Sequence, residues 1–379
     1  MKAKYDYIIA GAGCAGLSLA MHMIDNDELS QKKVLIIDRE LKLNNDRTWC
    51  FWEKGEGLFE SIVYKRWEQI SFNTEHNYCR YSILPYQYKM IRGIDFYNHC
   101  LQSIKKKPNF ELVHHSINHL FSSDDSTGVM LGEEWIAAEY VFNSIPPQKP
   151  LLNSKEYWLW QHFKGWLIQI PAPHFDDLVA TIMDFRVQGT EGDSAFCYVL
   201  PLSPTLALVE YTLFSHSLLD PPFYEKELLN YINSILGIKD FEILEVEEGK
   251  IPMTNYNFDL SQNNIINIGT NGGQTKGSTG YTFNFIQKHS KQIIENLLHH
   301  KKPLIRSSSK FRFYDSILLR LLDKSIYPAD LLFDKLFSRN KIQQVFKFLD
   351  NESDIGEDLR IISSLPFKPF LNTALGHLL

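Results

Sequence analysis

Cysteine is scarce in this sequence, and its few occurrences are scattered. The 379 residues contain five cysteines, and no two of them stand in a Cys-x-x-Cys spacing. An odd, dispersed set is not typical of a disulfide framework or of a structural zinc site. The sequence therefore predicts no metal site, and it favours a reducing compartment, which we take to be the cytoplasm.

The sequence also lacks an excess of positive charge. Its 39 lysines and arginines are outnumbered by 45 aspartates and glutamates, so the formal net charge at pH 7 is −6. Domains that bind nucleic acid usually carry a basic face. We therefore expect no nucleic-acid partner for this chain.

Long uncharged runs are missing apart from residues 8–24. A membrane-spanning helix needs about 20 apolar residues, and this stretch is interrupted by three glycines at fixed spacing. We expect no integral membrane segment, although a peripheral contact with a membrane surface stays open. The chain shows no internal repeat, and its 44% hydrophobic and 22% charged residues are typical of a globular protein.

The chain does contain, at its start, a strand, a glycine turn and a helix. Residues 8–10 are continuously apolar, as in a central parallel strand. In the G-x-G-x-x-G spacing that follows, the first glycine permits a tight turn, the second lets the backbone approach a pyrophosphate, and the third lets the helix pack on the strand. The glycines are Gly11, Gly13 and Gly16.

A second buried strand, residues 34–37, ends at Asp38. An acid at this place can hold a ribose hydroxyl of a dinucleotide. The order of these features predicts a dinucleotide-binding βαβ unit. The alternative is an ordinary βαβ turn whose glycines are incidental.

A second glycine-rich turn follows the apolar residues 265–268 and precedes an amphipathic helix. Backbone donors at the start of a helix suit the pyrimidine edge of a flavin. The candidate residues of this turn are Gly269, Gly272, Gly273, Thr279 and Gly280. Nearer the start of the chain, Arg47 is a candidate for a phosphate contact, and Trp49 or Trp52 for a wall against a flat ring. A capped loop with buried tryptophans is an equally good interpretation of that segment.

These motifs together resemble the bacterial lycopene β-cyclases, within the FAD-dependent fold of the p-hydroxybenzoate hydroxylase and glutathione reductase kind. The resemblance extends over nearly the whole chain. Besides the two glycine turns it rests on Arg47-Thr48-Trp49, Gln161-His162-Phe163-Lys164-Gly165, Met183-Asp184, Val209-Glu210-Tyr211-Thr212, Ile251-Pro252-Met253, Phe313-Tyr314-Asp315 and Asp358-Leu359-Arg360-Ile361. Three positions depart from the family pattern: Tyr211 replaces a second acid, Lys276 replaces a histidine, and Gly277 replaces a proline or small residue.

The resemblance implies an α/β fold in which a Rossmann-like FAD-binding domain is interleaved with a β-sheet substrate domain. It also implies a hairpin at residues 128–138 followed by a strand that returns to the nucleotide sheet. We expect the FAD-binding part in residues 1–60, 105–150 and 255–300, the substrate part in 61–104 and 151–254, and a helical part in 301–379.

The implied function is that of a lycopene β-cyclase, which forms β-ionone rings without net redox change. The resemblance implies FAD in its reduced form, NAD(P)H as the reductant, and lycopene or a related carotenoid as substrate. Glu210 would be the proton donor, because burial in an apolar strand favours its neutral form, and Asp184 would support it. A glutamate facing solvent is the alternative interpretation of Glu210.

Two other functions are compatible with the same residues. One is an FAD-dependent monooxygenase or prenyl reductase that acts on an apolar isoprenoid. The other is a carotenoid or lipid carrier without catalysis. For contact with a membrane, the sequence offers a basic run with a single acid, Glu295, which would otherwise be a solvated helix face. The run consists of Lys288, Lys291, Lys301, Lys302, Arg306, Lys310 and Arg312.

Overall fold

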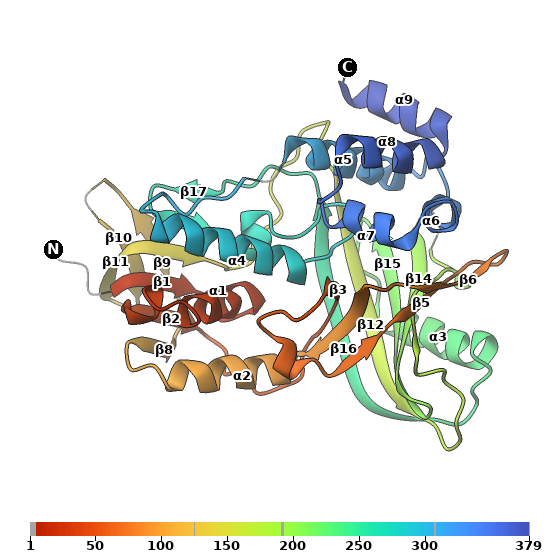
Figure 1. The fold of residues 1–379 in the computed structure, drawn as a ribbon, viewed down its shortest axis with the longest axis horizontal. Coiled ribbons are helices and arrows are strands. Elements are labelled where there is room, and N and C mark those ends of the chain that lie inside the picture. The colour runs from red at the N-terminus through yellow and green to blue at the C-terminus, as the bar shows by residue number, and fades with distance from the viewer. Residues whose placement is uncertain (1–4, 125, 191–192, 307, 379) are drawn as a thin grey trace.

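A computed structural model of the chain describes residues 5–124, 126–190, 193–306 and 308–378. An eight-stranded sheet forms its nucleotide side, at the left of Figure 1. Strand β1 pairs in parallel with β2 and β11, and β8 and β18 extend this parallel part. The strands are β1 (Tyr5–Ala10), β2 (Val34–Asp38), β8 (Phe110–His114), β9 (His119–Ser122), β10 (Thr127–Leu131), β11 (Glu134–Asn143), β17 (Ser261–Gln262) and β18 (Ile265–Asn267).

Both faces of this sheet are covered, which explains why its first strand is apolar without alternation. Ile9 packs into a core shared with α1 (Cys14–Ile24), α2 (Gly93–Lys105) and α4 (Phe283–Leu298). Ile8 packs on the opposite face against residues of β10 and β11. The predicted strand–turn–helix unit and the hairpin with its returning strand are therefore confirmed.

A seven-stranded, mostly antiparallel sheet forms the second half of the molecule, in the order β16-β12-β15-β14-β13-β5-β6. Its long middle strand, β12, pairs with β15 on one side and with β16 on the other. The strands are β5 (Gln69–Asn73), β6 (Tyr78–Ser82), β12 (Trp158–Gln169), β13 (Val179–Asp184), β14 (Ser194–Ser203), β15 (Leu206–Ser215) and β16 (Glu242–Thr254).

Different helices cover the two faces of this sheet (Figure 1). On one face α3 (Pro221–Asn230) packs through Tyr224 and Leu228. On the other face the C-terminal helices pack on an aromatic core, in which Phe72 stacks on Phe337 with ring centroids 4.9 Å apart. These helices are α5 (Ser309–Asp323), α6 (Ala329–Ser338), α7 (Ile342–Leu349), α8 (Ile355–Ser364) and α9 (Phe367–Leu378), as the sequence predicts.

A small three-stranded sheet links the two halves, with β7 (Tyr86–Arg92) between β3 (Thr48–Lys54) and β4 (Lys65–Trp67). Helix α2 follows β7 directly and packs on α1 and β8. It thus lies on the nucleotide side, whereas the expected boundaries assigned most of it to the substrate part. Within the described ranges, no helix combines the length and the apolar character needed to cross a membrane.

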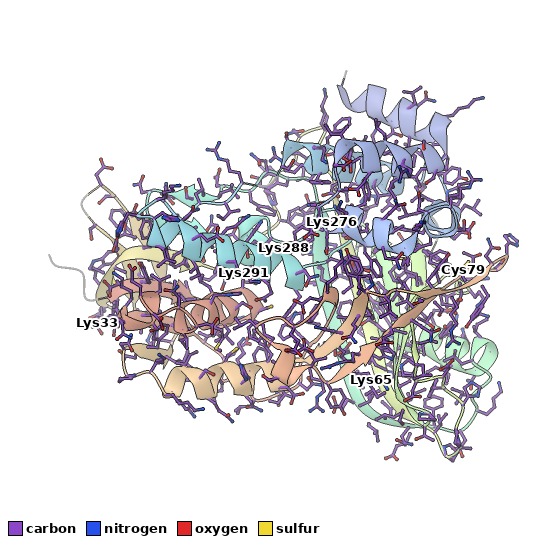
Figure 2. The ribbon with its side chains drawn as sticks, viewed as in Figure 1. Lys33, Lys65, Cys79, Lys276, Lys288 and Lys291 are labelled. Carbon is purple, nitrogen blue, oxygen red and sulfur yellow. The ribbon has the colours of Figure 1, made fainter. Side chains whose placement is uncertain are left out.

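The basic run after Tyr281 does not form the free cationic surface that its sequence suggests. Lys288 lies 2.7 Å from a carboxylate oxygen of Glu352, and Lys310 lies 2.6 Å from one of Asp358. Figure 2 shows Lys288 on α4 at the junction with the C-terminal helices. The acids come from far along the chain, so the local count of one acid was misleading.

Candidate active site

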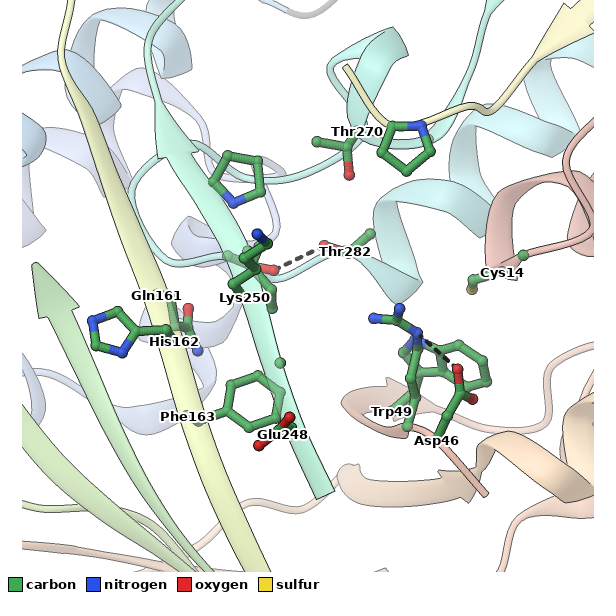
Figure 3. A pocket seen from close by; sticks show the side chains of 18 of the residues that line it. Cys14, Asp46, Trp49, Gln161, His162, Phe163, Glu248, Lys250, Thr270 and Thr282 are labelled. Atoms are coloured by element: carbon green, nitrogen blue, oxygen red, sulfur yellow. Dashed lines mark hydrogen bonds and ion pairs between the residues drawn. The ribbon is translucent and has the colours of Figure 1, made fainter. Parts of the chain in front are cut away.

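A large cavity of about 1420 Å³ lies between the nucleotide sheet and the seven-stranded sheet. Figure 3 shows its opposite walls, with Trp49 on one side and Gln161 and Phe163 of β12 on the other. The glycine turn after β1, the turn after β18 and Glu210 on β15 all line this one cavity. The fold therefore brings together residues that lie far apart in the sequence.

The first glycine turn leaves open space where a phosphate group would sit. Gly13 is the N-cap of α1, and a Cβ atom added to it would meet no protein atom within 4 Å. Gly16 is different, because its added Cβ would lie 1.9 Å from the carbonyl oxygen of Gly11. Gly11 and Gly13 thus line the cavity, while Gly16 permits close packing outside it. The start of α1 presents backbone N–H groups and a positive dipole end to this space.

Asp38 lies beside this turn at the cavity wall. Its carboxylate accepts hydrogen bonds from the backbone N–H groups of Ala12 (2.6 Å) and Glu40 (2.8 Å). These bonds fix the carboxylate at the end of β2, and its remaining lone pairs can accept from ribose hydroxyls. Arg47 also lines the cavity and is 57% exposed, as expected of a residue waiting for a phosphate.

The second glycine turn contributes only part of its predicted set. Gly269, Thr279 and Gly280 line the cavity, whereas Gly272 and Gly273 lie outside its wall. A Cβ on Gly272 would come within 2.3 Å of the Asn267 carbonyl oxygen, so this glycine serves the turn itself.

Two buried polar atoms at this end have no hydrogen-bond partner, namely Oγ1 of Thr279 and Oε1 of Gln161. Both residues line the cavity. Buried polar groups are nearly always satisfied in native proteins, so a bound polar molecule is the expected partner. The edge of a flavin ring, which carries both donors and acceptors, fits this requirement.

The two candidate tryptophans differ in position. Trp49 lines the cavity and packs edge-on against Phe96. Trp52 is buried and stacks on Phe346 of α7, with ring centroids 4.4 Å apart. Only Trp49 can therefore wall a bound ring.

Glu210 points into the cavity from β15, while its neighbour Tyr211 belongs to the core under α3 on the opposite face. The hydroxyl of Thr212 donates a 2.7 Å hydrogen bond to Oε1 of Glu210. The surrounding wall is formed by Leu208 and by the aromatic rings of Tyr88 and Tyr198. Burial in this setting raises the pKa of Glu210 well above its usual range, so the carboxyl group is neutral near pH 7.

A second carboxyl group, missed by the sequence analysis, lies next to Glu210. Glu247 on β16 lines the same cavity, and the Thr48 hydroxyl donates a 2.6 Å hydrogen bond to its Oε2. Burial also raises the pKa of Glu247. Gly165 of β12 stands between the two acids, since it pairs with Glu210 on one side and Glu247 on the other.

Asp184, the other predicted catalytic residue, does not reach the cavity. It is 1% exposed and forms an ion pair of 2.6 Å with Arg186. It also accepts hydrogen bonds from Tyr231 (2.8 Å) and Asn73 (3.1 Å). The expected support of Glu210 by Asp184 is therefore not direct, because the carboxylate is fully engaged in holding β13, β5 and the π-helix Tyr231–Ile235 together.

The profile of the family described as lycopene cyclase protein matches residues 6–375. The chain belongs to the lycopene cyclase family. Two plant members of known name share this similarity: a chloroplastic neoxanthin synthase of Solanum tuberosum is 25% identical over 299 residues, and that of Solanum lycopersicum is 25% identical over 302. Each match covers 74% of this chain and 58% of the relative, so the chain spans little more than half of these proteins.

Solved structures share the fold of this lycopene cyclase family member at low identity. A geranylgeranyl bacteriochlorophyll reductase-like protein from Thermoplasma acidophilum aligns with a TM-score of 0.58 at 11% identity, over 97% of this chain and 95% of that chain. The flavin-dependent brominase Bmp2 aligns with a TM-score of 0.60 at 11% identity, over 94% and 97%. The halogenase PltM, solved in complex with FAD, gives 0.58 at 12%, over 91% and 78%. The predicted α/β fold with its Rossmann-like part is confirmed.

Two of the departures from the family pattern have structural explanations in this member. Tyr211 replaces the second acid, but its side chain faces away from the cavity and donates a hydrogen bond to the backbone of Gln188. Lys276 replaces a histidine, and its ammonium group lies 2.8 Å from Asp315 on α5 and 2.8 Å from Asn351 (Figure 2). Neither change therefore alters the chemistry of the cavity wall.

Proposed function

We propose that this protein is a lycopene β-cyclase, which closes the linear end group of a carotenoid into a β-ionone ring by acid-initiated, redox-neutral chemistry. One observation carries the proposal: a neutral carboxylic acid, Glu210, lies in an aromatic cavity that continues to a dinucleotide-type glycine turn. An acid at that position can start a reaction on a hydrocarbon that offers no polar group to bind.

The reaction needs three events at one end of the substrate. The O–H bond of Glu210 breaks as its proton forms a C–H bond with the terminal alkene, a second alkene attacks the resulting cation, and a proton leaves the new ring. Water would trap the cation, so the site must exclude it. Aromatic faces stabilise the positive charge without reacting with it. Those that line the cavity are Trp49, Tyr88, Trp158, Trp160, Phe163, Tyr198 and Tyr281.

The proposal includes FAD as the cofactor, with NAD(P)H as its reductant. The residues that would hold it are Gly11, Gly13 and Asp38 at the dinucleotide end, Arg47 at a phosphate, and Gly269, Thr279 and Gly280 at the ring, all on the cavity wall. When bound and reduced, the flavin supplies negative charge that favours the cationic substrate. Gly16, Gly272 and Gly273 would act indirectly, by shaping the two turns.

The apolar substrate also has to enter from a membrane. Ile145 and Leu218 are respectively 39% and 47% exposed, and both line the cavity. Exposed apolar groups around a cavity are typical of a contact with lipid or with another apolar surface. We therefore favour an apolar peripheral contact over the electrostatic one, since Lys288 and Lys310 are already paired with acids.

This contact predicts that the protein floats with neutral as well as anionic liposomes, and that added salt changes little. Leu218→Glu is expected to weaken flotation, because it would place a charge at the lipid boundary. The matched control is Leu359→Glu on α8, at a leucine that is 61% exposed and outside the cavity. Flotation that requires anionic lipid, or equal loss in both variants, would contradict an apolar contact at the cavity mouth.

The function itself is tested by expressing the chain in bacteria that accumulate lycopene. We expect the pigment extract to contain β-carotene, identified by chromatography and absorption spectrum. The purified protein with FAD should convert lycopene without net consumption of NAD(P)H, because the cyclisation moves no electrons. Stoichiometric NAD(P)H oxidation with a hydroxylated or reduced product would instead identify a monooxygenase or prenyl reductase. Unchanged lycopene that copurifies with the protein would identify a carrier.

A further inference from the structure

The two acids of the cavity meet across a single residue of the middle strand. In β12, Gly165 pairs with Glu210 of β15 and with Glu247 of β16. A Cβ added to Gly165 would lie 3.1 Å from Cγ of Glu247 and 3.4 Å from Cβ of Glu210. Glycine inside a strand often marks a close approach of neighbouring groups. Here the missing side chain lets two carboxyl groups from non-adjacent strands occupy the same space.

We propose that Glu210 and Glu247 form a carboxyl pair that shares one proton, and that Glu247 is the positioning residue that keeps this proton on Glu210 between turnovers. The inference rests on the proposed function, in which Glu210 is the proton donor. It assigns a role to Glu247 that the departure at Tyr211 left vacant.

Hydroxyl groups occupy the outer side of the pair. Thr212 donates to Oε1 of Glu210 at 2.7 Å, and Thr48 donates to Oε2 of Glu247 at 2.6 Å. The two carboxyl groups also hydrogen-bond to each other, which raises the pKa of Glu210 and lowers that of Glu247. A hydrogen bond between two carboxyl groups requires a proton on one of them, and these opposite effects place it on Glu210.

Charge around the pair works in the same direction. Besides Glu210, the charged groups that act on Glu247 are Glu245 and Asp46, which are both negative. Lys164, next to Gly165, is drawn away to Glu225 at 2.6 Å. Two carboxylates side by side in a desolvated site cannot both stay ionised. The pair therefore holds one proton over a wide range of pH.

The other titratable groups that face Glu210 are neutral. They are the thiol of Cys50 on β3 and the phenols of Tyr88 on β7, Tyr198 on β14 and Tyr281 before α4. Burial raises the pKa of each of them above its usual range. The pair is thus the group of this pocket that titrates near neutral pH.

Protons balance over one ring closure. Glu210 loses its proton to the alkene and becomes a carboxylate, which lies beside the carboxylate of Glu247. The ring then loses one proton, which returns to the Glu210 carboxylate, and the pair again holds a single proton. The neighbouring negative charge of Glu247 makes this return favourable.

The test is the pH dependence of cyclisation in the Glu247→Gln variant of the FAD-loaded protein. Activity requires protonated Glu210, so it falls as pH rises through the raised pKa of that group. Removing the charge of Glu247 lowers this pKa, and we expect the alkaline fall to move down by about one pH unit or more. Glu247→Asp keeps the charge and should keep the fall near its native position.

Glu245→Gln is the matched control. It removes a negative charge from the same strand at a residue that contacts Asn45 and does not line the cavity. We expect its profile to stay close to that of the native protein. A Glu247→Gln variant that is slower by the same factor at every pH would show a structural role and overturn the proposal.

A second measurement keeps the pair separate from the proposed function. The carboxylic-acid C=O stretch in infrared difference spectra reports the proton directly, and Glu210→Gln identifies its band. If the native protein cyclises no carotenoid, the proposed function fails while this band still tests the pair. A band whose titration midpoint falls in Glu247→Gln supports the shared proton, and an unchanged midpoint refutes it.

Discussion

Replacing Glu210 by glutamine is expected to abolish cyclisation while leaving FAD bound. Glutamine has the size and shape of glutamate but carries no acidic proton, and general acid catalysis typically contributes 10²–10⁴-fold. The loss should be at the upper end or beyond it, because an unprotonated alkene has no other way to begin. We expect no β-carotene above background in lycopene-accumulating cells and an unchanged flavin spectrum in the purified variant.

Stability should not fall with this change at neutral pH. Burial raises the pKa of Glu210 well above its usual range, so the native protein must hold a proton there that the unfolded chain has lost. A carboxyl with a raised pKa stabilises the folded state only at low pH, and this contribution is lost as pH rises through the folded pKa. Glutamine needs no proton, so unfolding at pH 7 should be equal or slightly less favourable than in the native protein.

Asp184→Asn is the matched control for the loss of a carboxylate in the same sheet. Asp184 binds Arg186, Tyr231 and Asn73 and does not line the cavity. Losing one charged hydrogen-bond partner costs about 1.5–3 kcal/mol of stability, while the folded fraction should still cyclise. Near-normal β-carotene from Glu210→Gln together with none from Asp184→Asn would exchange the two roles.

The second large effect is expected at Gly13, where valine should prevent FAD binding. The backbone of Gly13 has φ −84° and ψ −167°, which any residue can adopt, and an added Cβ meets no protein atom within 4 Å. The apo protein should therefore fold normally. The same side chain would fill the space at the start of α1 that the pyrophosphate needs, so purified Gly13→Val should lack flavin absorbance.

Gly16→Val provides the contrast. Its Cβ would lie 1.9 Å from the Gly11 carbonyl oxygen, so this variant should lose thermal stability as well as flavin. A Gly13→Val protein that is folded and retains one FAD per chain would show that the dinucleotide does not bind over this turn.

Local patterns in the sequence predicted much of the nucleotide side. The spacing of Gly11, Gly13 and Gly16 and the acid at Asp38 belong to one short βαβ unit, so neighbouring residues determine its structure. Glu210 was found through its motif, and the structure places it in the cavity wall. The second glycine turn was predicted with too many contacts, because Gly272 and Gly273 shape the turn without reaching the cavity.

Long-range pairing explains what the sequence did not show. Glu247 meets Glu210 only because β16 and β15 flank β12 in a particular register, and no local pattern specifies that register. A glycine inside the strand at Gly165 and the acidic residues before Ile251-Pro252-Met253 were the available signals. Likewise, the partners of Lys288 and Asp184 come from other elements, so charge and burial at these residues could not be judged from sequence neighbours.

The covering of the seven-stranded sheet by the last helices also has a consequence for the order of folding. Phe72 stacks on Phe337, and Trp52 on Phe346, so early strands find their aromatic partners near the end of the chain. While the ribosome is still making α5–α9, that face of the sheet stays open to water. Exposed apolar surface of this kind is prone to aggregation. The catalytic half of the protein is therefore completed only after synthesis ends, when it depends most on chaperones.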